Sequence, residues 1–132
     1  MDMNSLTQKS QEALTSAQSI AVLAGQIETD EEHLLLALLQ QEEGLVPRLL
    51  QTAGADVEAV RADVEAEIAR KPSVSGSSPQ TGQVYLSRSL TSTLERAERE
   101  AKRLKDSYIS VEHLVLALAD DSSNRAASRV LR

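Results

Sequence analysis

Two histidines, each directly after a glutamate, are the side chains of this sequence that could most readily bind a metal ion. Glu32-His33-Leu34 and Glu112-His113-Leu114 follow Asp30 and Ser110, so both histidines fall in the first turn of a predicted helix. Two equivalent histidines could form the halves of one metal site. Neither, however, has a histidine or glutamate four residues later, which is the spacing of a helical zinc site. We therefore expect two structural histidines, each bonding within its own half of the chain.

Ionic binding at helix N-termini is a second candidate chemistry. Thr7 and Ser87 are predicted N-caps, where a hydroxyl beside unpaired backbone N–H groups can bind an anion. Glu32 and Glu112 lie in first turns, where a carboxylate can take a guanidinium. The plainer interpretation is that all four are caps and first-turn acids, each cap contributing about 0.5–2 kcal/mol. The residues alone leave both interpretations open.

The 132 residues lack the patterns of several enzyme classes. Cysteine is absent, and there is neither a Gly-x-x-x-x-Gly-Lys-[Ser/Thr] phosphate loop nor a Gly-x-Ser-x-Gly nucleophile motif. We therefore expect that this chain is not an enzyme and that this domain holds no metal and no cofactor.

Charge and hydropathy exclude two kinds of partner. With 14 Lys and Arg against 20 Asp and Glu, the net charge of −6 speaks against nucleic acid, whose phosphates bind basic residues. The longest apolar run, Leu34 to Leu39, is far shorter than the roughly 20 residues of a membrane span. Met1 to Leu14 lacks the apolar centre of a signal peptide. We expect a cytoplasmic protein without a membrane partner.

Helices are the elements that must position these residues. The sequence has no Phe, no Trp and two Tyr, and its 41% of hydrophobic residues are mostly Leu, Val, Ile and Ala. Such residues, at spacings of three and four, predict an all-α fold. The predicted helices run from Thr7 to Gly25, after Asp30, around 46–50, from Asp56 to Pro72, from Ser87, after Ser110, and over about 124–131.

The sequence repeats itself at an offset of 80 residues. Leu6-Thr7 falls on Leu86-Ser87, and the register holds without a gap as far as Leu36-Ala37-Leu38 on Leu116-Ala117-Leu118. An internal repeat of this kind indicates a duplicated structural unit. We predict a single domain, 1–132, made of repeat one (1–71), a Ser/Gly/Pro linker (72–85) and repeat two (86–132), packed about a pseudo-twofold axis. The apolar helices after Asp30 and Ser110 should be sandwiched between others.

These residues resemble the Clp repeat, which occurs in pairs as the N-terminal domain of Clp-type AAA+ unfoldases. The resemblance rests on the Leu6-Thr7 opening and on the Glu-His-Leu signature that appears twice, and it covers essentially the whole chain. Within the family, residues 6–14 and the long polar linker look most like the ClpB disaggregases, and less like ClpC or ClpA. In the family the second repeat of the four-helix unit continues into an eighth helix matching Val57 to Arg70. Since this sequence stops at Arg132, we expect repeat two to be truncated, without its last helix.

The resemblance implies a binding module. A ClpB-like N-terminal domain captures unfolded or aggregated polypeptide for threading by the parent AAA+ hexamer in stress recovery and refolding, with the DnaK chaperone system as a further partner of the full-length protein. ATP and magnesium would belong to the parent's AAA+ modules. The alternative is a ClpC-like domain that binds adaptors or phosphoarginine in an unfoldase–protease complex. A free-standing regulatory or structural helical protein is the third class.

Site residues also follow from the resemblance. In ClpC-type domains the matching hydroxyl and glutamate of each repeat bind phosphoarginine, which implies sites made by Thr7 with Glu32 and by Ser87 with Glu112. In ClpB-type domains the positions matching Thr7, Asp106 and Glu112 are implicated in chaperone function.

An apolar groove between helices of repeat two is the other candidate surface. ClpB-like domains bind exposed apolar segments of unfolded polypeptides in such a groove, for which Leu90, Leu94 and Tyr108 are the candidates here, with Leu86 and Val115 beside them. The alternative for each of these residues is an ordinary place in the core.

Overall fold

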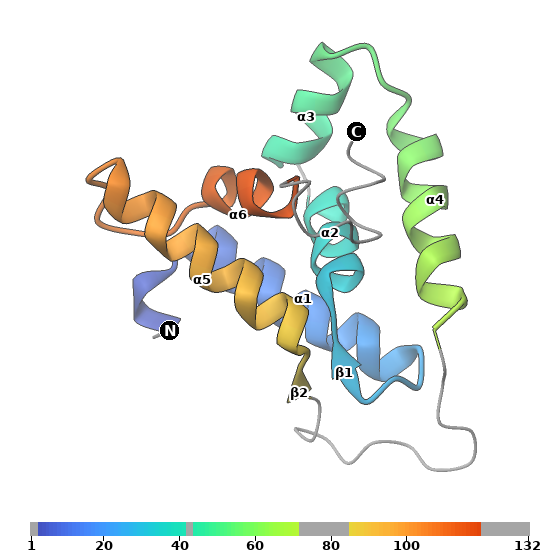
Figure 1. Cartoon of the computed structure of the whole chain (residues 1–132). Helices are drawn as coiled ribbons and strands as arrows, with labels where there is room; N and C mark the ends of the chain where they lie inside the picture. Colours follow the sequence, from blue (N-terminus) through green and yellow to red (C-terminus); the bar gives the residue numbers. More distant parts are fainter. Residues whose placement is uncertain (1–2, 42–43, 72–84, 120–132) are drawn as a thin grey trace.

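The computed structural model describes residues 3–41, 44–71 and 85–119 (Figure 1). These residues are mostly helical, which confirms the all-α class. The predicted helix at about 124–131 and residues 72–84 of the predicted linker lie outside the described residues. Tyr85, placed at the end of that linker, lies instead in a two-residue strand. The elements in chain order are η1 (Met3–Ser5), α1 (Gln8–Leu23), β1 (Glu28–Thr29), α2 (Glu31–Gln40), α3 (Leu45–Thr52), α4 (Val57–Ala69), β2 (Tyr85–Leu86), α5 (Arg88–Arg103) and α6 (Val111–Leu118).

The helices begin at the capping residues that the sequence predicts. The Thr7 hydroxyl accepts a hydrogen bond from the Ser10 N–H at 3.2 Å, and the Ser87 hydroxyl accepts one from the Leu90 N–H at 3.0 Å. Each bond satisfies a backbone donor that has no partner inside its own helix. α1 and α5 therefore start at equivalent positions of the two repeats.

α1 and α5 also end alike, although the terminating residues differ. Gly25 follows α1 with a φ of 72°, and Lys105, 80 residues later, follows α5 with a φ of 61°. Glycine adopts this left-handed conformation without a steric penalty, whereas lysine does so at some cost. The repeat thus imposes the same helix end on a residue that does not favour it.

The two repeats exchange short strand pairings. β1 of repeat one pairs in parallel with β2 of repeat two, and the Ser87 N–H donates to the Thr29 carbonyl at 2.9 Å. In the reverse direction the Thr7 N–H donates to the Ile109 carbonyl at 3.0 Å, beside a parallel bridge between Leu6 and Ile109. At an offset of 80 these two contacts are the same contact with the repeats interchanged. This is the arrangement that a pseudo-twofold axis produces.

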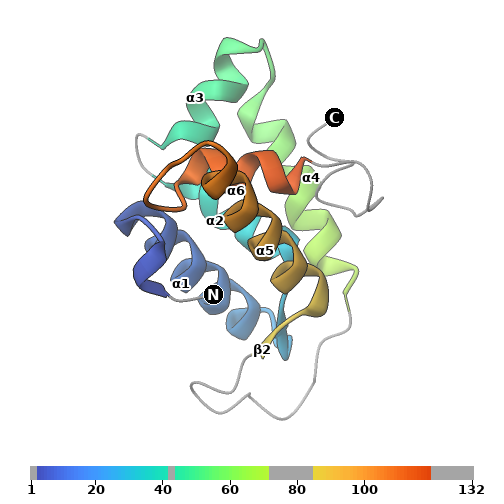
Figure 2. The same ribbon diagram turned by 60° about the vertical axis from the view of Figure 1, so that its left-hand side comes forward.

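α2 lies at the centre of the core, as the sequence predicts. It contacts α1, α3, α4, α5 and α6, and Figures 1 and 2 show it surrounded by them. Its residues 31–39 are all buried, and Leu34, Leu35 and Leu38 are each 0% exposed. The equivalent α6 also contacts α1, α2, α3 and α5, but it is less enclosed than α2, because Leu116 is 56% exposed.

Among the described residues there is no helix both long enough and apolar enough to cross a bilayer.

Candidate functional site

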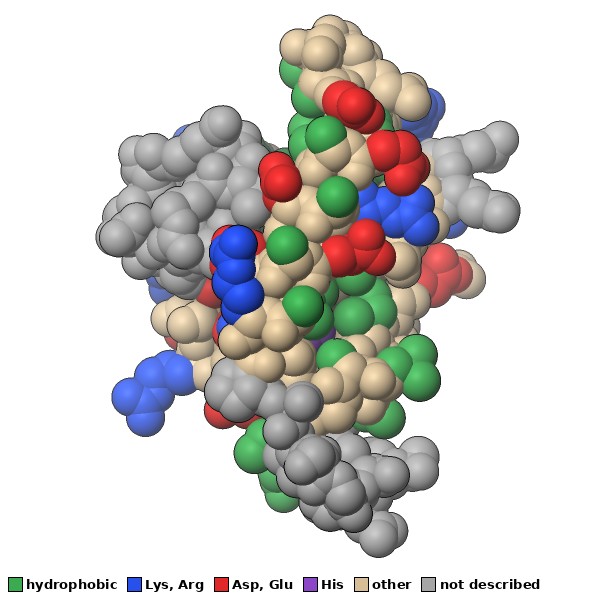
Figure 3. All heavy atoms as spheres, turned by 90° about the vertical axis from the view of Figure 1, so that its right-hand side faces the viewer, with side chains coloured by type: hydrophobic (Ala, Val, Ile, Leu, Met, Phe, Trp, Pro, Cys, Tyr) green, Lys and Arg blue, Asp and Glu red, His purple; other side chains and the backbone are tan. Residues whose placement is uncertain are grey.

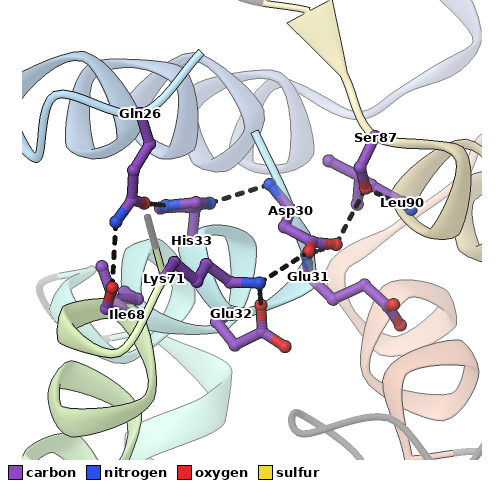
Figure 4. Close-up of polar contacts among 9 residues, drawn as sticks. All are labelled: Gln26, Asp30, Glu31, Glu32, His33, Ile68, Lys71, Ser87 and Leu90. Carbon is purple, nitrogen blue, oxygen red and sulfur yellow. Dashed lines mark hydrogen bonds and ion pairs between the residues drawn. The ribbon is translucent and has the colours of Figure 1, made fainter. Parts of the chain in front are cut away.

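The N-terminus of α2 gathers a polar cluster from three separate parts of the chain (Figure 4). Asp30 is at its centre. One carboxylate oxygen accepts from the Glu31 N–H at 2.9 Å and from the Ser87 hydroxyl at 2.8 Å, and the other lies 2.9 Å from the Lys71 ammonium. Burial raises the pKa of Asp30, but the hydrogen bonds from Lys71, the Glu31 N–H and Ser87 together hold that pKa below its ordinary value. Asp30 therefore joins the end of repeat one to the beginning of α5.

Glu32 completes this cluster from inside the molecule. Its side chain is 5% exposed, and its carboxylate lies 3.0 Å from the Lys71 ammonium. Burial disfavours the charge on Lys71, but Asp30 and Glu32 together raise the pKa of Lys71 above its ordinary value. The lysine thus occupies the place beside Glu32 where an external cation would otherwise bind.

His33 is bonded within repeat one, which confirms the structural role expected for it. The Asp30 N–H donates to Nδ1 at 2.8 Å, so the ring proton is on Nε2, which donates to Gln26 Oε1 at 2.6 Å. Gln26 in turn donates to the Ile68 carbonyl at 2.9 Å and so links the ring to the end of α4. Burial lowers the pKa of His33 below its ordinary value of 6.5, because it disfavours the charged imidazolium, and the nearby Lys71 ammonium acts in the same direction.

This lowered pKa predicts a loss of stability in mild acid. Between pH about 7.5 and about 5.5 the unfolded chain binds a proton at His33 that the folded chain resists, so the free energy of unfolding should fall as the pH falls. A His33→Gln variant should be less stable at neutral pH and should show a shallower fall over this range. Urea unfolding at several pH values measures both. An unchanged slope in the variant would contradict the assignment.

Repeat two holds the equivalent histidine with a different partner. The Ser110 N–H donates to His113 Nδ1 at 2.8 Å, and Nε2 lies 2.8 Å from Asp106 Oδ2. Asp106 stands 80 residues after Gln26, so a carboxylate replaces an amide in the same geometry. No group of three or more Asp, Glu, His or Cys in the described part of the chain is placed to hold a metal ion.

The structure gives Thr7 and Ser87 other neighbours than the resemblance implies. The resemblance implies sites that pair Thr7 with Glu32, and Ser87 with Glu112. Because the repeats exchange their strands, Ser87 lies beside Asp30 at the start of α2, the helix of Glu32. Thr7 bonds instead to Ile109, just before α6, the helix of Glu112. Ser87 thus reaches the start of α2 through its hydroxyl, whereas Thr7 reaches the segment before α6 through its backbone N–H.

The two acidic first turns also differ in access. Glu32 is buried against Lys71, whereas Glu112 is exposed. The two equivalent glutamates therefore have unlike surroundings in this structure. Asp106 and Tyr108 lie close by in sequence, with 51% of the Asp106 side chain and 57% of Tyr108 exposed. Asp106 bonds to His113 of α6, Glu112 lies in the first turn of α6, Tyr108 precedes that helix, and the Thr7 backbone bonds to Ile109 just before it. We call Thr7, Asp106, Tyr108 and Glu112 the acidic surface.

Leu90 and Leu94 are in the core rather than on a surface. They are 0% and 5% exposed, and both belong to the cluster of buried apolar side chains that forms the core of the described residues. They lie on the apolar face of α5, which packs inward. In this structure both are therefore core residues and not groove residues. Of the three groove candidates, Tyr108 alone presents a large exposed area.

Two residues of this site, Gln26 and Lys71, are not among those predicted from the sequence. Gln26 could have been found, because it stands seven residues before His33, as Asp106 does before His113. Lys71 could not, since it reaches Asp30 and Glu32 across about 40 residues of chain without any local pattern.

Comparison with known proteins gives a consistent result. Residues 5–132 match the family described as the Clp repeat (R) N-terminal domain. The chain is 45% identical over 124 residues to the chaperone protein ClpB of Bacillus cereus, which covers 94% of the chain and 14% of that protein. It is 43% identical over all 132 residues to the chaperone protein ClpB of Nitratidesulfovibrio vulgaris, 15% of that protein.

A solved structure supports the same fold. The N-terminal domain of the ClpV1 ATPase from the E. coli Sci1 type VI secretion system superposes with a TM-score of 0.81 at 26% identity, over 98% of this chain and 78% of that one. The chain spans about one seventh of the length of the curated relatives it matches. With the doubled Glu-His-Leu signature and the exchanged strands, these matches show that the chain belongs to the Clp repeat N-terminal domain family.

Proposed function

We propose that this chain is the N-terminal substrate-binding domain of a ClpB-like ATP-dependent disaggregase. In this role it captures unfolded or aggregated polypeptide in the cytoplasm and passes it to the AAA+ hexamer of its parent, whose own modules use ATP and magnesium. The family and the ClpB relatives support the assignment to such a parent. The DnaK system is the partner that we expect for the full-length protein.

The acidic surface is the observation that best supports the capture of unfolded polypeptide. Asp106 and Glu112 offer carboxylates, and the Tyr108 ring offers an exposed apolar and aromatic face beside them. Unfolded chains expose Arg, Lys and apolar side chains together. A carboxylate can pair with the cationic groups, while the ring stacks on a guanidinium or covers an apolar side chain. Such contacts are weak singly and tolerate many sequences, which suits clients of varied composition.

A binding experiment tests this role. The variant Tyr108→Ala/Glu112→Lys should bind a labelled, permanently unfolded casein about tenfold more weakly in fluorescence anisotropy, a loss equivalent to 1.4 kcal/mol. Glu65→Lys, an equal charge change at an exposed residue of α4, is the matched control and should bind as the unmodified chain does. Equal binding by the double variant and the control would refute the role of this surface. An unmodified chain that binds no unfolded protein would refute the capture function itself.

A further inference from the structure

His113 is a buried ring that bonds to an exposed carboxylate. Its side chain is 5% exposed and that of Asp106 is 51% exposed, and Nε2 lies 2.8 Å from Asp106 Oδ2. The Ser110 N–H donates to Nδ1 at 2.8 Å, so the proton of the neutral ring is on Nε2 and is donated to the carboxylate. His113 therefore fixes one oxygen of Asp106, while about half of that side chain stays accessible to solvent.

This pairing is particular to repeat two. In repeat one the equivalent His33 bonds to Gln26, a neutral amide that is 5% exposed. A proton added to His33 would place a charge beside an amide inside the protein. A proton added to His113 would place a charge beside a carboxylate of the acidic surface. Of the two histidines, only His113 is placed to alter the charge at that surface.

Repeat two also has a partner for the charged form of the ring. The Ser110 hydroxyl oxygen lies 3.0 Å from His113 Nδ1, in addition to the Ser110 N–H at 2.8 Å. When Nδ1 gains a proton, it can no longer accept from the N–H, but it can donate to the hydroxyl oxygen. Nε2 keeps its bond to Asp106, which becomes a hydrogen bond between opposite charges. The fold can thus hold His113 in either state of charge.

The other elements packed on α6 bring little free charge to His113. On α5, the pKa of Glu100 is lowered by its bond to Arg103 and, to a smaller extent, by His113. On α6 itself, Glu112 precedes the ring and is exposed. α1, α2 and α3 also contact α6, and their described residues make no hydrogen bond or ion pair to the His113 side chain. Asp106 is therefore the charge that His113 meets most directly.

We propose that His113 controls how strongly the acidic surface binds cationic segments of unfolded polypeptide. With a neutral ring, Asp106 presents a full negative charge, held in place by Nε2, to a guanidinium or ammonium of the client. With a charged ring, imidazolium and carboxylate compensate each other, and the pair attracts an external cation much less. The domain then releases cationic clients in mild acid. This inference rests on the proposed capture of unfolded polypeptide and adds its regulation by pH.

Peptide binding compared with the titration of the ring tests the proposal. The probe is a labelled disordered peptide of repeated Arg-Leu-Gly units with blocked ends, whose own charge does not change between pH about 8 and about 5. Over this range its affinity in fluorescence anisotropy should fall about fivefold, the upper range for one exposed ion pair. NMR spectra of the imidazoles give the pH at which each histidine titrates, and the loss of affinity should follow His113 and not His33. Circular dichroism at each pH checks that the domain is folded.

Asp106→Gln separates the carboxylate from the rest of the arrangement. It places at position 106 the amide that repeat one carries at Gln26, so the bond from His113 and the fold should be retained. At pH about 8 this variant should bind the peptide about fivefold more weakly than the unmodified chain, and its affinity should not change as His113 titrates.

Glu65→Gln is the matched control, because it removes one negative charge as Asp106→Gln does. Glu65 is exposed on α4, along which acidic side chains gather on the face shown in Figure 3. This variant should bind the peptide as the unmodified chain does and should keep the pH dependence.

The proposed regulation and the proposed capture fail in distinguishable ways. The regulation is wrong if the affinity of the unmodified chain stays constant while the His113 ring titrates, or if Asp106→Gln keeps the same pH dependence. In either case the peptide and unfolded casein still bind at neutral pH, so the capture function is unaffected. If neither the peptide nor casein binds at any pH, the capture function is refuted, and the regulation with it.

Discussion

Replacing Leu90 with alanine should lower the free energy of unfolding by about 2–5 kcal/mol, the usual cost of truncating a buried leucine. Leu90 is 0% exposed and belongs to the apolar cluster that includes α2. Removing its side chain leaves a cavity that helices packed on several sides cannot easily close. Urea unfolding followed by circular dichroism gives the difference from the shift in midpoint at constant slope.

Leu23→Ala is the control for this change. Leu23 is 87% exposed at the end of α1, so the same truncation there should alter stability by no more than about 0.5 kcal/mol. The core assignment would be contradicted if Leu90→Ala kept the stability of the unmodified chain and lost client binding instead. In that case Leu90 would belong to an apolar client-binding groove.

Replacing Lys71 with methionine should destabilise the fold by about 1–3 kcal/mol at neutral pH, because the buried Glu32 carboxylate then lacks a compensating charge. Methionine keeps most of the aliphatic stem and removes the ammonium. Glu32, with 5% of its side chain exposed, would then lose the cation that lies 3.0 Å from its carboxylate. Asp30, which is more exposed and bonded to Ser87, should tolerate the loss better.

A second substitution separates the ion pair from other effects of the change. The double variant Glu32→Gln/Lys71→Met has no isolated charge at position 32 and should regain most of the lost stability, as a double-mutant cycle would show. If Lys71→Met were as stable as the unmodified chain, the ammonium would not compensate Glu32. If the double variant were no more stable than Lys71→Met, the loss would lie in packing at the end of α4.

Local signals made the helix positions predictable. Thr7, Asp30, Asp56 and Ser87 each stand before an apolar periodicity, and each one caps a helix in the structure. The offset of 80 residues also predicted that the two histidines would share a geometry, and they do. The helix caps and the contact of each histidine with its N-cap backbone involve residues within one turn of each other. They can therefore be recognised directly in the sequence.

The partners of the site depend on contacts that no local pattern displays. The strand exchange places Ser87 next to Asp30 across 57 positions, and the internal repeat alone is compatible with pairing within either repeat. The exposure of the glutamates could not be predicted either, because Glu32 and Glu112 have the same sequence context, yet Glu32 lies against Lys71 and Glu112 is exposed. Equivalent positions predicted equivalent backbone geometry, and they did not predict equivalent surroundings.

The exchange of strands between the repeats bears on how the two halves can diverge. Two identical units joined through the same contacts would form a symmetric dimer, in which each substitution alters both interfaces at once. A single chain that carries both units removes this constraint, so Gln26 in one half corresponds to Asp106 in the other, and Ser16 to Arg96. One scaffold can then hold a glutamate closed by an internal lysine and its counterpart open to solvent, a combination that no symmetric pair of identical units can have.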